Sequence, residues 1–149
     1  MAALLRVAVR DDIAPIQRVR HAVRENRLTS GVITDDEVRE HLELLGRGWV
    51  VELDGTIRAF AIGNRRTANV WALFVEQGHE RRGFGRQLHD TMMAWFWTVG
   101  VPRVWLSTGA GTRAEGFYRA AGWRDAGLTA HGELRFEMER PGSARTWPR

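Results

Sequence analysis

The order of apolar and polar residues predicts helices and strands from the N-terminus onward. Leu4–Val9 alternates with a period near two, as a short strand does. Asp11, Asp12 and Pro15 are typical of a helix start. The helix that they open continues with apolar residues at helical spacing, namely Ile13, Ile16, Val19 and Val23. A polar stretch, Glu25–Gly31, then interrupts the pattern.

A second helix and a hairpin are predicted next. Thr34–Glu37 has the residues of a capping box, and Gly46 is a typical helix stop. The apolar stripe between them consists of Val38, Leu42 and Leu45. Asp54 and Gly55 form the pair that a tight type I′ turn favours. They join two strand-like segments, Trp49–Leu53 and Thr56–Ile62.

The middle of the chain combines a long apolar run with a glycine-rich loop. After a turn at Arg65–Asn69, Val70–Val75 is apolar throughout, which predicts a central strand buried on both faces. The loop Gln77–Gly85 follows, and then a helix that Gly100 and Pro102 end. The apolar face of that helix consists of Leu88, Met92, Trp95, Phe96 and Val99.

The last third adds a strand, a short helix and a final pair of strands. Val104 and Leu106 mark the strand. Thr112–Glu115 has the residues of a second capping box, and its helix turns three residues inward, Ala114, Phe117 and Ala121. Trp123–Thr129 and Glu133–Arg140 then form an antiparallel pair. The order β-α-α-β-β-β-α-β-α-β-β predicts one α+β domain over 1–140, with a loose tail over 141–149.

Composition excludes several chemistries. The 149 residues include no cysteine, and all 22 basic residues are arginine. The chain therefore has no thiolate nucleophile, no cysteine-bound metal, no Schiff-base lysine and no P-loop lysine. Its five histidines are scattered, so we expect no metal site. No apolar run is long enough to span a membrane, and the start of the chain lacks a signal-peptide pattern, so we expect a cytoplasmic protein.

The formal net charge of +4 leaves nucleic-acid binding as one hypothesis. However, basic residues are interspersed with acidic ones, which is more typical of a solvated mixed surface than of a nucleic-acid stripe. The seven tryptophans give little more, because core packing is the commoner role for each of them. Trp49, Trp71 and Trp123 are the ones that would suit an acceptor pocket instead.

The loop before the long helix carries the clearest chemical signal. A strand runs into Gly83-Phe84-Gly85, where the helix begins. The first N–H groups of a helix have no partner within it, and glycine lets them approach an anion closely, so this arrangement suits a diphosphate. Arg81, Arg82 and Arg86 add positive charge. The alternative is that the glycines only form a tight turn.

Two motifs resemble the GCN5-related N-acetyltransferase (GNAT) superfamily. Glu80–Gly85 is similar to the family's Gln/Arg-x-x-Gly-x-Gly/Ala loop, and Phe117–Trp123 is similar to its F-Y-x-x-x-G-F segment. One helix and one strand separate them, as in the family. The resemblance implies a single α+β domain with a mixed, mostly antiparallel sheet that splays between strands four and five. About four helices flank such a sheet.

The resemblance also implies a function, direct transfer of an acetyl group from acetyl-CoA to a primary amine. Tyr118, otherwise read as a core aromatic, would be the general acid. Backbone groups of a central-strand set and a loop set would bind acetyl-CoA: Leu73, Phe74 and Val75, then Arg81, Arg82, Gly83, Phe84, Gly85 and Arg86. The sequence departs from the motif at Glu80, whose carboxylate we expect to face solvent. It also has Gly111 where many relatives carry Asn.

The general base and the acceptor stay open at this point. Glu76, at the end of the central strand, is the first candidate for the base, and a loop acid or cap is its alternative role. Further candidates are His79, His131, Glu133, Glu25 and Asn26. The acceptor could be a small amine, an amino acid, an antibiotic or a protein N-terminus. A homodimer, a non-catalytic acyl-CoA sensor and, less favoured, a nucleic-acid-binding module are the remaining hypotheses.

Overall fold

The structure is a computed structural model that describes residues 2–23 and 32–142. Its strands form one sheet in the order β1-β2-β3-β4-β5-β7-β6, in which only β4 and β5 run parallel. The strands are β1 (Ala3–Val7), β2 (Gly46–Leu53), β3 (Thr56–Asn64), β4 (Asn69–Val75), β5 (Arg103–Thr108), β6 (Arg124–Leu128) and β7 (Leu134–Glu139). The helices are α1 (Ile13–Ala22), α2 (Asp35–Glu40), α3 (Phe84–Thr98) and α4 (Arg113–Ala120), with short helical segments η1 (Arg10–Asp12), η3 (His41–Leu45) and η4 (Glu80–Arg82).

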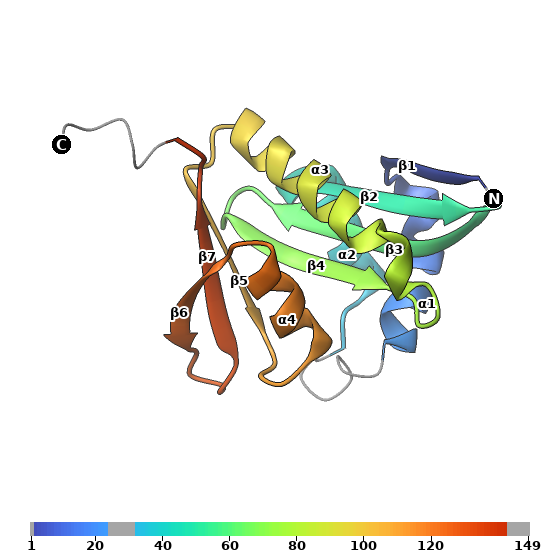
Figure 1. The fold of residues 1–149 in the computed structure, drawn as a ribbon. Coiled ribbons are helices and arrows are strands. Elements are labelled where there is room, and N and C mark those ends of the chain that lie inside the picture. The colour runs from blue at the N-terminus through green and yellow to red at the C-terminus, as the bar shows by residue number, and fades with distance from the viewer. Residues whose placement is uncertain (1, 24–31, 143–149) are drawn as a thin grey trace.

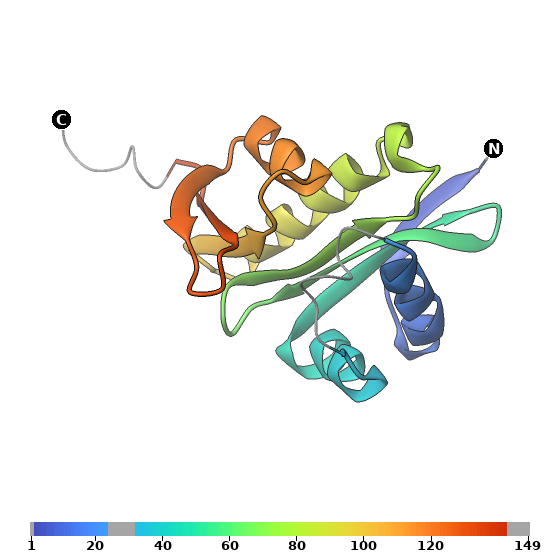
Figure 2. The same ribbon diagram turned by 90° about the horizontal axis from the view of Figure 1, so that it is seen from below.

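This architecture confirms the predicted fold class and the predicted order of elements. Helices α3 and α4 cover one face of the sheet, and α1 and α2 cover the other (Figures 1 and 2). Alternation along β2 supplies both layers, because Trp49 and Val51 pack toward α3 whereas Val50 packs toward α1. No helix among residues 2–23 and 32–142 is long and apolar enough to cross a membrane.

The turn and one of the two helix caps that short sequence motifs predict are present in the structure. Asp54 and Gly55 both have positive φ, as a type I′ turn requires. The Thr34 hydroxyl accepts from the Glu37 N–H at 3.1 Å, and the Glu37 carboxylate accepts from the Thr34 N–H at 2.9 Å, so the first capping box is complete. The second is not, because the Glu115 carboxylate accepts from the Gly111 N–H instead.

Three boundaries differ from the predictions or lie outside the described residues. The first strand ends at Val7 rather than Val9, because Val9 precedes the turn of η1. Gly46 ends the second helical segment as expected, since it follows Leu45 of η3, but it is also the first residue of β2 and pairs with Asn64, so this strand starts before the predicted Trp49. The expected loose tail falls almost entirely on 143–149, which are outside the described residues.

Strands β4 and β5 separate almost as soon as they start. Their parallel pairing has a single register point, Asn69 opposite Trp105. The pairing of β4 with β3 also skips Trp71, which marks a bulge there. Beyond this point, one edge of β4 has no strand partner among the described residues.

This separation corrects the expectation that Val70–Val75 is buried on both faces. Only Val70 and Ala72 are fully buried, and the last three residues of β4 are half-exposed because they line a cavity. The Glu76 N–H donates to the Arg58 carbonyl of β3 at 2.8 Å. The N–H and C=O groups of successive residues point to opposite edges of a strand. The backbone groups of Phe74 therefore also point toward β3, whereas those of Leu73 and Val75 point toward the space between β4 and β5.

Candidate functional site

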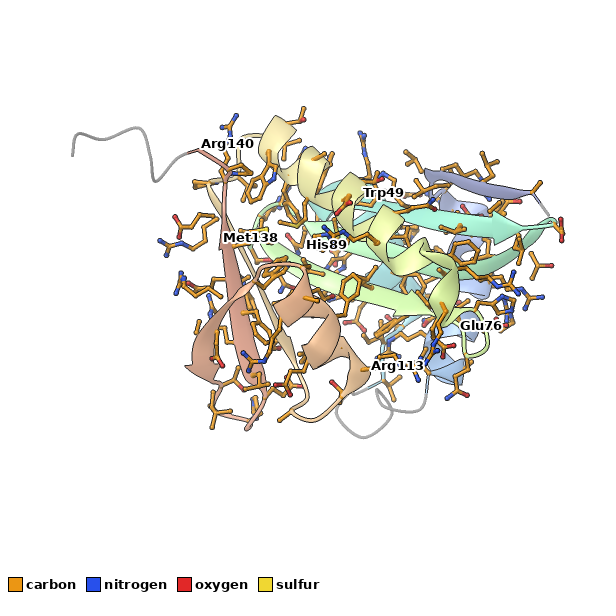
Figure 3. The ribbon with its side chains drawn as sticks, in the orientation of Figure 1. Trp49, Glu76, His89, Arg113, Met138 and Arg140 are labelled. Atoms are coloured by element: carbon orange, nitrogen blue, oxygen red, sulfur yellow. The ribbon has the colours of Figure 1, made fainter. Side chains whose placement is uncertain are left out.

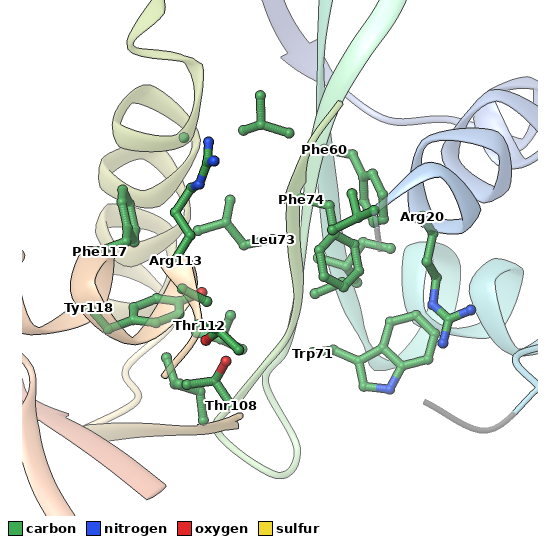
Figure 4. Close-up of a pocket in the computed structure, with 18 of the residues that line it drawn as sticks. Arg20, Phe60, Trp71, Leu73, Phe74, Thr108, Thr112, Arg113, Phe117 and Tyr118 are labelled. Atoms are coloured by element: carbon green, nitrogen blue, oxygen red, sulfur yellow. The ribbon is translucent and has the colours of Figure 1, made fainter. Parts of the chain in front are cut away.

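A cavity of about 580 Å³ opens where β4 and β5 separate. Strand β4 runs through it and divides it into two halves (Figure 4). The half that we call the loop half contains Leu73, Arg113 and Phe117 in Figure 4. It lies against α4 and against the loop before α3, whose lining residues, with the start of α3, are Glu80, Gly83, Gly85 and Arg86. The other, the α1 half, includes Arg20, Phe60, Trp71 and Phe74. The two halves belong to one cavity, which is lined by residues from both faces of the sheet.

The loop half contains the start of α3. Gly83 has φ +81°, the left-handed conformation that favours glycine, and it caps this helix. The first hydrogen bond of α3 runs from the Gln87 N–H to the Gly83 carbonyl at 3.0 Å. The N–H groups of the α3 residues before Gln87 therefore have no acceptor within this helix. A Cβ on Gly83 would meet no atom within 4 Å. The backbone here is open to the cavity, and glycine is required for its φ rather than for lack of space.

The structure brings together some of the predicted loop residues and separates others. Gly83, Gly85 and Arg86 line the cavity, and the side chain of Phe84 is buried in the core beneath them. Arg86 pairs with Asp90 one turn further along α3, at 3.2 Å. Arg81 and Arg82 are exposed, and their side chains do not line the cavity. They remain suited to long-range attraction of an anion rather than to contact within the cavity.

Glu80 does not face solvent as expected. Its side chain is 25% exposed and lines the cavity, with one oxygen accepting from the Gly78 N–H at 2.9 Å. The other oxygen lies 3.3 Å from the guanidinium of Arg113, which also lines the cavity. Hydrogen bonds from its own N–H and that of Gly78, together with Arg113, lower the pKa of the Glu80 carboxyl. The carboxylate therefore organises the loop, and Arg113 offsets its charge.

Tyr118 reaches the cavity from α4 (Figure 4) and is also packed in the core. Its ring makes edge contacts with Phe117 and Trp123, at centroid distances of 5.2 and 5.6 Å. Burial raises the pKa of the Tyr118 phenol well above its usual value. Both roles considered from the sequence, core aromatic and proton donor, are thus compatible with this position.

Behind Tyr118, α4 is tied to α3 through a buried histidine. The Trp123 indole N–H donates to His89 Nε2 at 2.9 Å, and His89 Nδ1 lies 2.8 Å from the Asp90 carboxylate. Because Nε2 accepts, the proton of the neutral ring is on Nδ1. Burial lowers the pKa of His89 more than Asp90 raises it. This neutral histidine links the helix of the loop half to the segment that follows Tyr118.

Glu76 is turned away from the cavity, which it does not line. Figure 3 shows it at the end of β4, beside the loop that leads into α3. Arg18 of α1 and Arg58 of β3 bind its two oxygens at 2.5 and 2.6 Å, and its side chain is 14% exposed. Burial opposes ionisation, but the two arginines outweigh it and lower the pKa of the Glu76 carboxyl. These contacts make Glu76 a clamp between α1, β3 and β4 and a weak proton acceptor.

The other candidates for the base occupy different places. Glu133 lines the cavity, and its carboxylate accepts from the Ser107 hydroxyl of β5 at 3.1 Å. His131 is exposed on the β6–β7 turn, and His79 lies 3.9 Å from the Glu76 carboxylate; neither lines the cavity. Two more, Glu25 and Asn26, lie outside the described residues. Within the described residues, Glu80 and Glu133 are the carboxylates that line the cavity.

Arg20 and Arg113 line the cavity and were not singled out from the sequence. A signal was present for Arg20, which shares the apolar face of the first helix with Ile16 and Val23. Arg113 follows the N-cap of α4, where a basic residue gives no such signal. No cluster of three or more His, Asp or Glu residues that could hold a metal is found in the part of the chain that the structure describes.

Comparison with known proteins places this geometry in context. The model of the acetyltransferase (GNAT) family matches residues 9–123. Among solved structures, the PaiA N-acetyltransferase of Thermoplasma acidophilum in complex with coenzyme A aligns with a TM-score of 0.80 at 12% identity, covering 94% of this chain and 100% of that chain. The ribosomal-protein-S18-alanine N-acetyltransferase of Escherichia coli aligns with a TM-score of 0.72 at 17% identity, covering 92% of each chain. No curated protein matches the sequence.

Proposed function

Because the chain belongs to the GNAT acetyltransferase family, whose members use acetyl-CoA, we propose that it transfers the acetyl group of acetyl-CoA to a primary amine. The amine attacks directly, in one complex of protein, acetyl-CoA and acceptor. The absence of cysteine supports this route, since the chain has no thiol to carry an acetyl intermediate.

The proposal rests on one observation: the unpaired edge of β4 and the N-terminal end of α3 both line the same cavity. The free edge of β4 offers the N–H and C=O groups of Leu73 and Val75, which suit the amides of the pantetheine arm. The start of α3 offers the N–H groups from Arg81 to Arg86, with Gly83 in the left-handed conformation that exposes them, and these suit the pyrophosphate. The residues present therefore fit acetyl-CoA. Phe74, which we had expected to bind acetyl-CoA through its backbone, is not part of this proposal, because its N–H and C=O groups face β3.

Two groups of the chain handle protons in this proposal. Acetyl-CoA supplies a thioester, whose carbon accepts the amine and whose sulfur leaves as a thiolate. Tyr118, whose phenol is protonated at neutral pH, donates a proton to that sulfur, and the proton that the nitrogen releases as the amide forms restores the phenol. The N–H of Leu73 or Val75 on the free edge of β4 stabilises the negative charge that develops on the carbonyl oxygen.

Glu133 is our candidate for the group that accepts a proton from the incoming ammonium. Its carboxylate lines the cavity and is oriented by the Ser107 hydroxyl, whereas the Glu76 carboxylate is bound by two arginines. A proton acceptor must reach the amine directly or through one water, which the position of Glu133 favours. This assignment replaces Glu76, the first candidate from the sequence.

The experiment that tests the function is a transfer screen in two stages. Acetyl-CoA should first raise the melting temperature of the purified protein, because a ligand of the native state stabilises it. A panel of amino acids, polyamines, aminoglycosides and peptides is then incubated with acetyl-CoA, and free CoA is measured. A thermal shift with release of CoA above the amine-free rate supports an enzyme. A thermal shift without release from any amine would instead support a non-catalytic sensor of acyl-CoA.

A further inference from the structure

The α1 half of the cavity is almost entirely apolar. Of the described residues that line it, one is charged, Arg20 of α1. The rest belong to the core cluster that packs under α1 and α2, and they are Ile16, Ile33, Val38, Phe60, Ile62, Trp71, Ala72 and Phe74. The two carboxylates of the cavity lie elsewhere, Glu80 on the loop before α3 and Glu133 between β6 and β7. An acceptor in the α1 half therefore meets hydrocarbon, aromatic rings and one positive charge.

Trp71 is held as a fixed wall of this half. It sits at the bulge of β4, and its ring stacks on His41 with a centroid distance of 3.7 Å and an interplanar angle of 12°. His41 is itself fixed, because Nδ1 lies 2.9 Å from the Glu37 carbonyl and Nε2 lies 3.3 Å from the Asn64 amide nitrogen. The Asn64 oxygen accepts from the N–H groups of Arg66 and Thr67, which orients that amide.

This network makes the aromatic surface of Trp71 available without reorganisation. A stacked, hydrogen-bonded support loses little side-chain entropy when a ligand packs against it. An apolar or aromatic body fits such a wall better than a flexible polar chain does. Phe74, in edge contact with Phe60 at 5.4 Å, extends the same surface toward the core.

Arg20 lines the same half as Trp71 (Figure 4). It is half-buried, and its burial lowers the pKa of the guanidinium although Glu37 acts in the opposite direction. The guanidinium stays charged at neutral pH, so a positive charge faces a low-dielectric space. Such a charge favours a carboxylate or another planar anion, which it can bind in a bidentate manner, and it disfavours a polycation.

We propose that the acceptor is an amine that also carries an apolar or aromatic body and an anionic group. The proposal rests on acetyl transfer as described above. The amine faces Tyr118 and Glu133, the body packs on Trp71 and Phe74, and the anion binds Arg20. Both an α-carboxylate, as in an aromatic amino acid, and a carboxylate at the far end of the molecule meet this description.

Matched pairs of acceptors test the inference. Phenylalanine is compared with phenylalaninamide, and 4-(aminomethyl)benzoate with 4-(aminomethyl)benzamide; spermidine represents polycationic amines. Steady-state kcat/KM is measured at saturating acetyl-CoA for the wild type, Arg20→Gln, Arg20→Lys and Trp71→Leu. Arg103→Gln is the control, because Arg103 is exposed on β5 and pairs with Glu139 outside the cavity.

The wild type should favour at least one acid over its amide by about tenfold or more, and spermidine should be the poorest acceptor. Arg20→Gln should bring the acid-to-amide ratio near one through KM, Arg20→Lys should restore part of it, and Trp71→Leu should weaken both members of a pair. The pair with the larger ratio tells whether the carboxylate is adjacent to the amine or distal. Arg103→Gln should behave as the wild type.

Transfer to amides or spermidine with kcat/KM equal to or above that of the acids would overturn the inference and leave acetyl transfer intact. A ratio unchanged in folded Arg20→Gln would do the same. The wild-type ratios decide the question even if the variants fold poorly. Absence of both an acetyl-CoA thermal shift and any acetylated amine would instead overturn the proposed function on which the inference rests.

Discussion

Replacing Glu76 by Gln separates a structural clamp from a catalytic base. In the structure, the carboxylate accepts at 2.5 and 2.6 Å from Arg18 and Arg58, which are 46% and 29% exposed. Gln keeps the shape but loses the charge, and its NH₂ group faces one of the arginines. Exposed ion pairs contribute about 0–1 kcal/mol and breaking buried ones costs about 3–5 kcal/mol, so this half-buried pair of contacts should cost about 1–2 kcal/mol. For a chain of this size the melting temperature should fall by roughly 3–6 °C.

The loss of stability should depend on pH in a defined direction. Arg18 and Arg58 hold the pKa of Glu76 below its usual value of 4.5 in the folded state despite burial. The stabilisation is therefore present above that pH and is lost as pH falls through the folded-state pKa. Urea unfolding of the wild type and Glu76→Gln at pH 7 and below pH 4.5 measures this, and the two curves should converge in acid. Glu43→Gln, which removes an exposed pair with Arg10, is the control and should change little.

Turnover decides between the two roles. If Glu76 only clamps α1 to the sheet, Glu76→Gln should change kcat less than threefold at temperatures where it is folded. Loss of a general base lowers the rate by about 10²–10⁴. A wild-type melting temperature together with such a loss of kcat would show that Glu76 is a catalytic group and not a structural clamp.

Three further predictions concern the loop half and its support. Tyr118→Phe should lower kcat by about 100-fold or more, with little change in acetyl-CoA affinity measured by calorimetry; unchanged turnover would remove the tyrosine from catalysis. Gly83→Ala should cost about 1–2 kcal/mol of backbone strain at φ +81° and weaken acetyl-CoA binding. The matched Gly78→Ala, at φ +93° with equal space, should show the strain alone, and equal affinities in the two variants would argue against the loop as the anion site. Burial lowers the pKa of His89, so the urea midpoint should decrease as pH falls below the usual value of 6.5, and less so in His89→Gln; identical pH dependence would contradict this account.

Local patterns predicted most of the fold. Hydrophobic periodicity identified the helices and strands in order, and short-range signals such as Thr34 with Glu37 and Asp54 with Gly55 formed the expected cap and turn. These features depend on residues within a few positions of one another, where sequence spacing and spatial distance agree.

The parts that could not be predicted depend on distant residues. Glu76 is bound by Arg18, which is 58 positions away in the sequence, and by Arg58, which is 18 positions away. No spacing rule predicts contacts over such separations. The apolar run of β4 is not buried on both faces, because β5 separates from it after a single paired position. The sequence does not show where two strands stop pairing. Glu80 turns inward because a backbone N–H two residues earlier and Arg113 on another helix satisfy its oxygens.

Acetyl transfer in the cavity between β4 and β5 can be tested by following an isotope-labelled acetyl group from acetyl-CoA to an amine. Purified protein is incubated with labelled acetyl-CoA and a mixture of amines, and products are identified by mass spectrometry. We expect a labelled N-acetyl product from the wild type and at least about 100-fold slower formation by Tyr118→Phe. Saturable binding of acetyl-CoA with no labelled amine, or equal rates for the two proteins, would contradict this expectation.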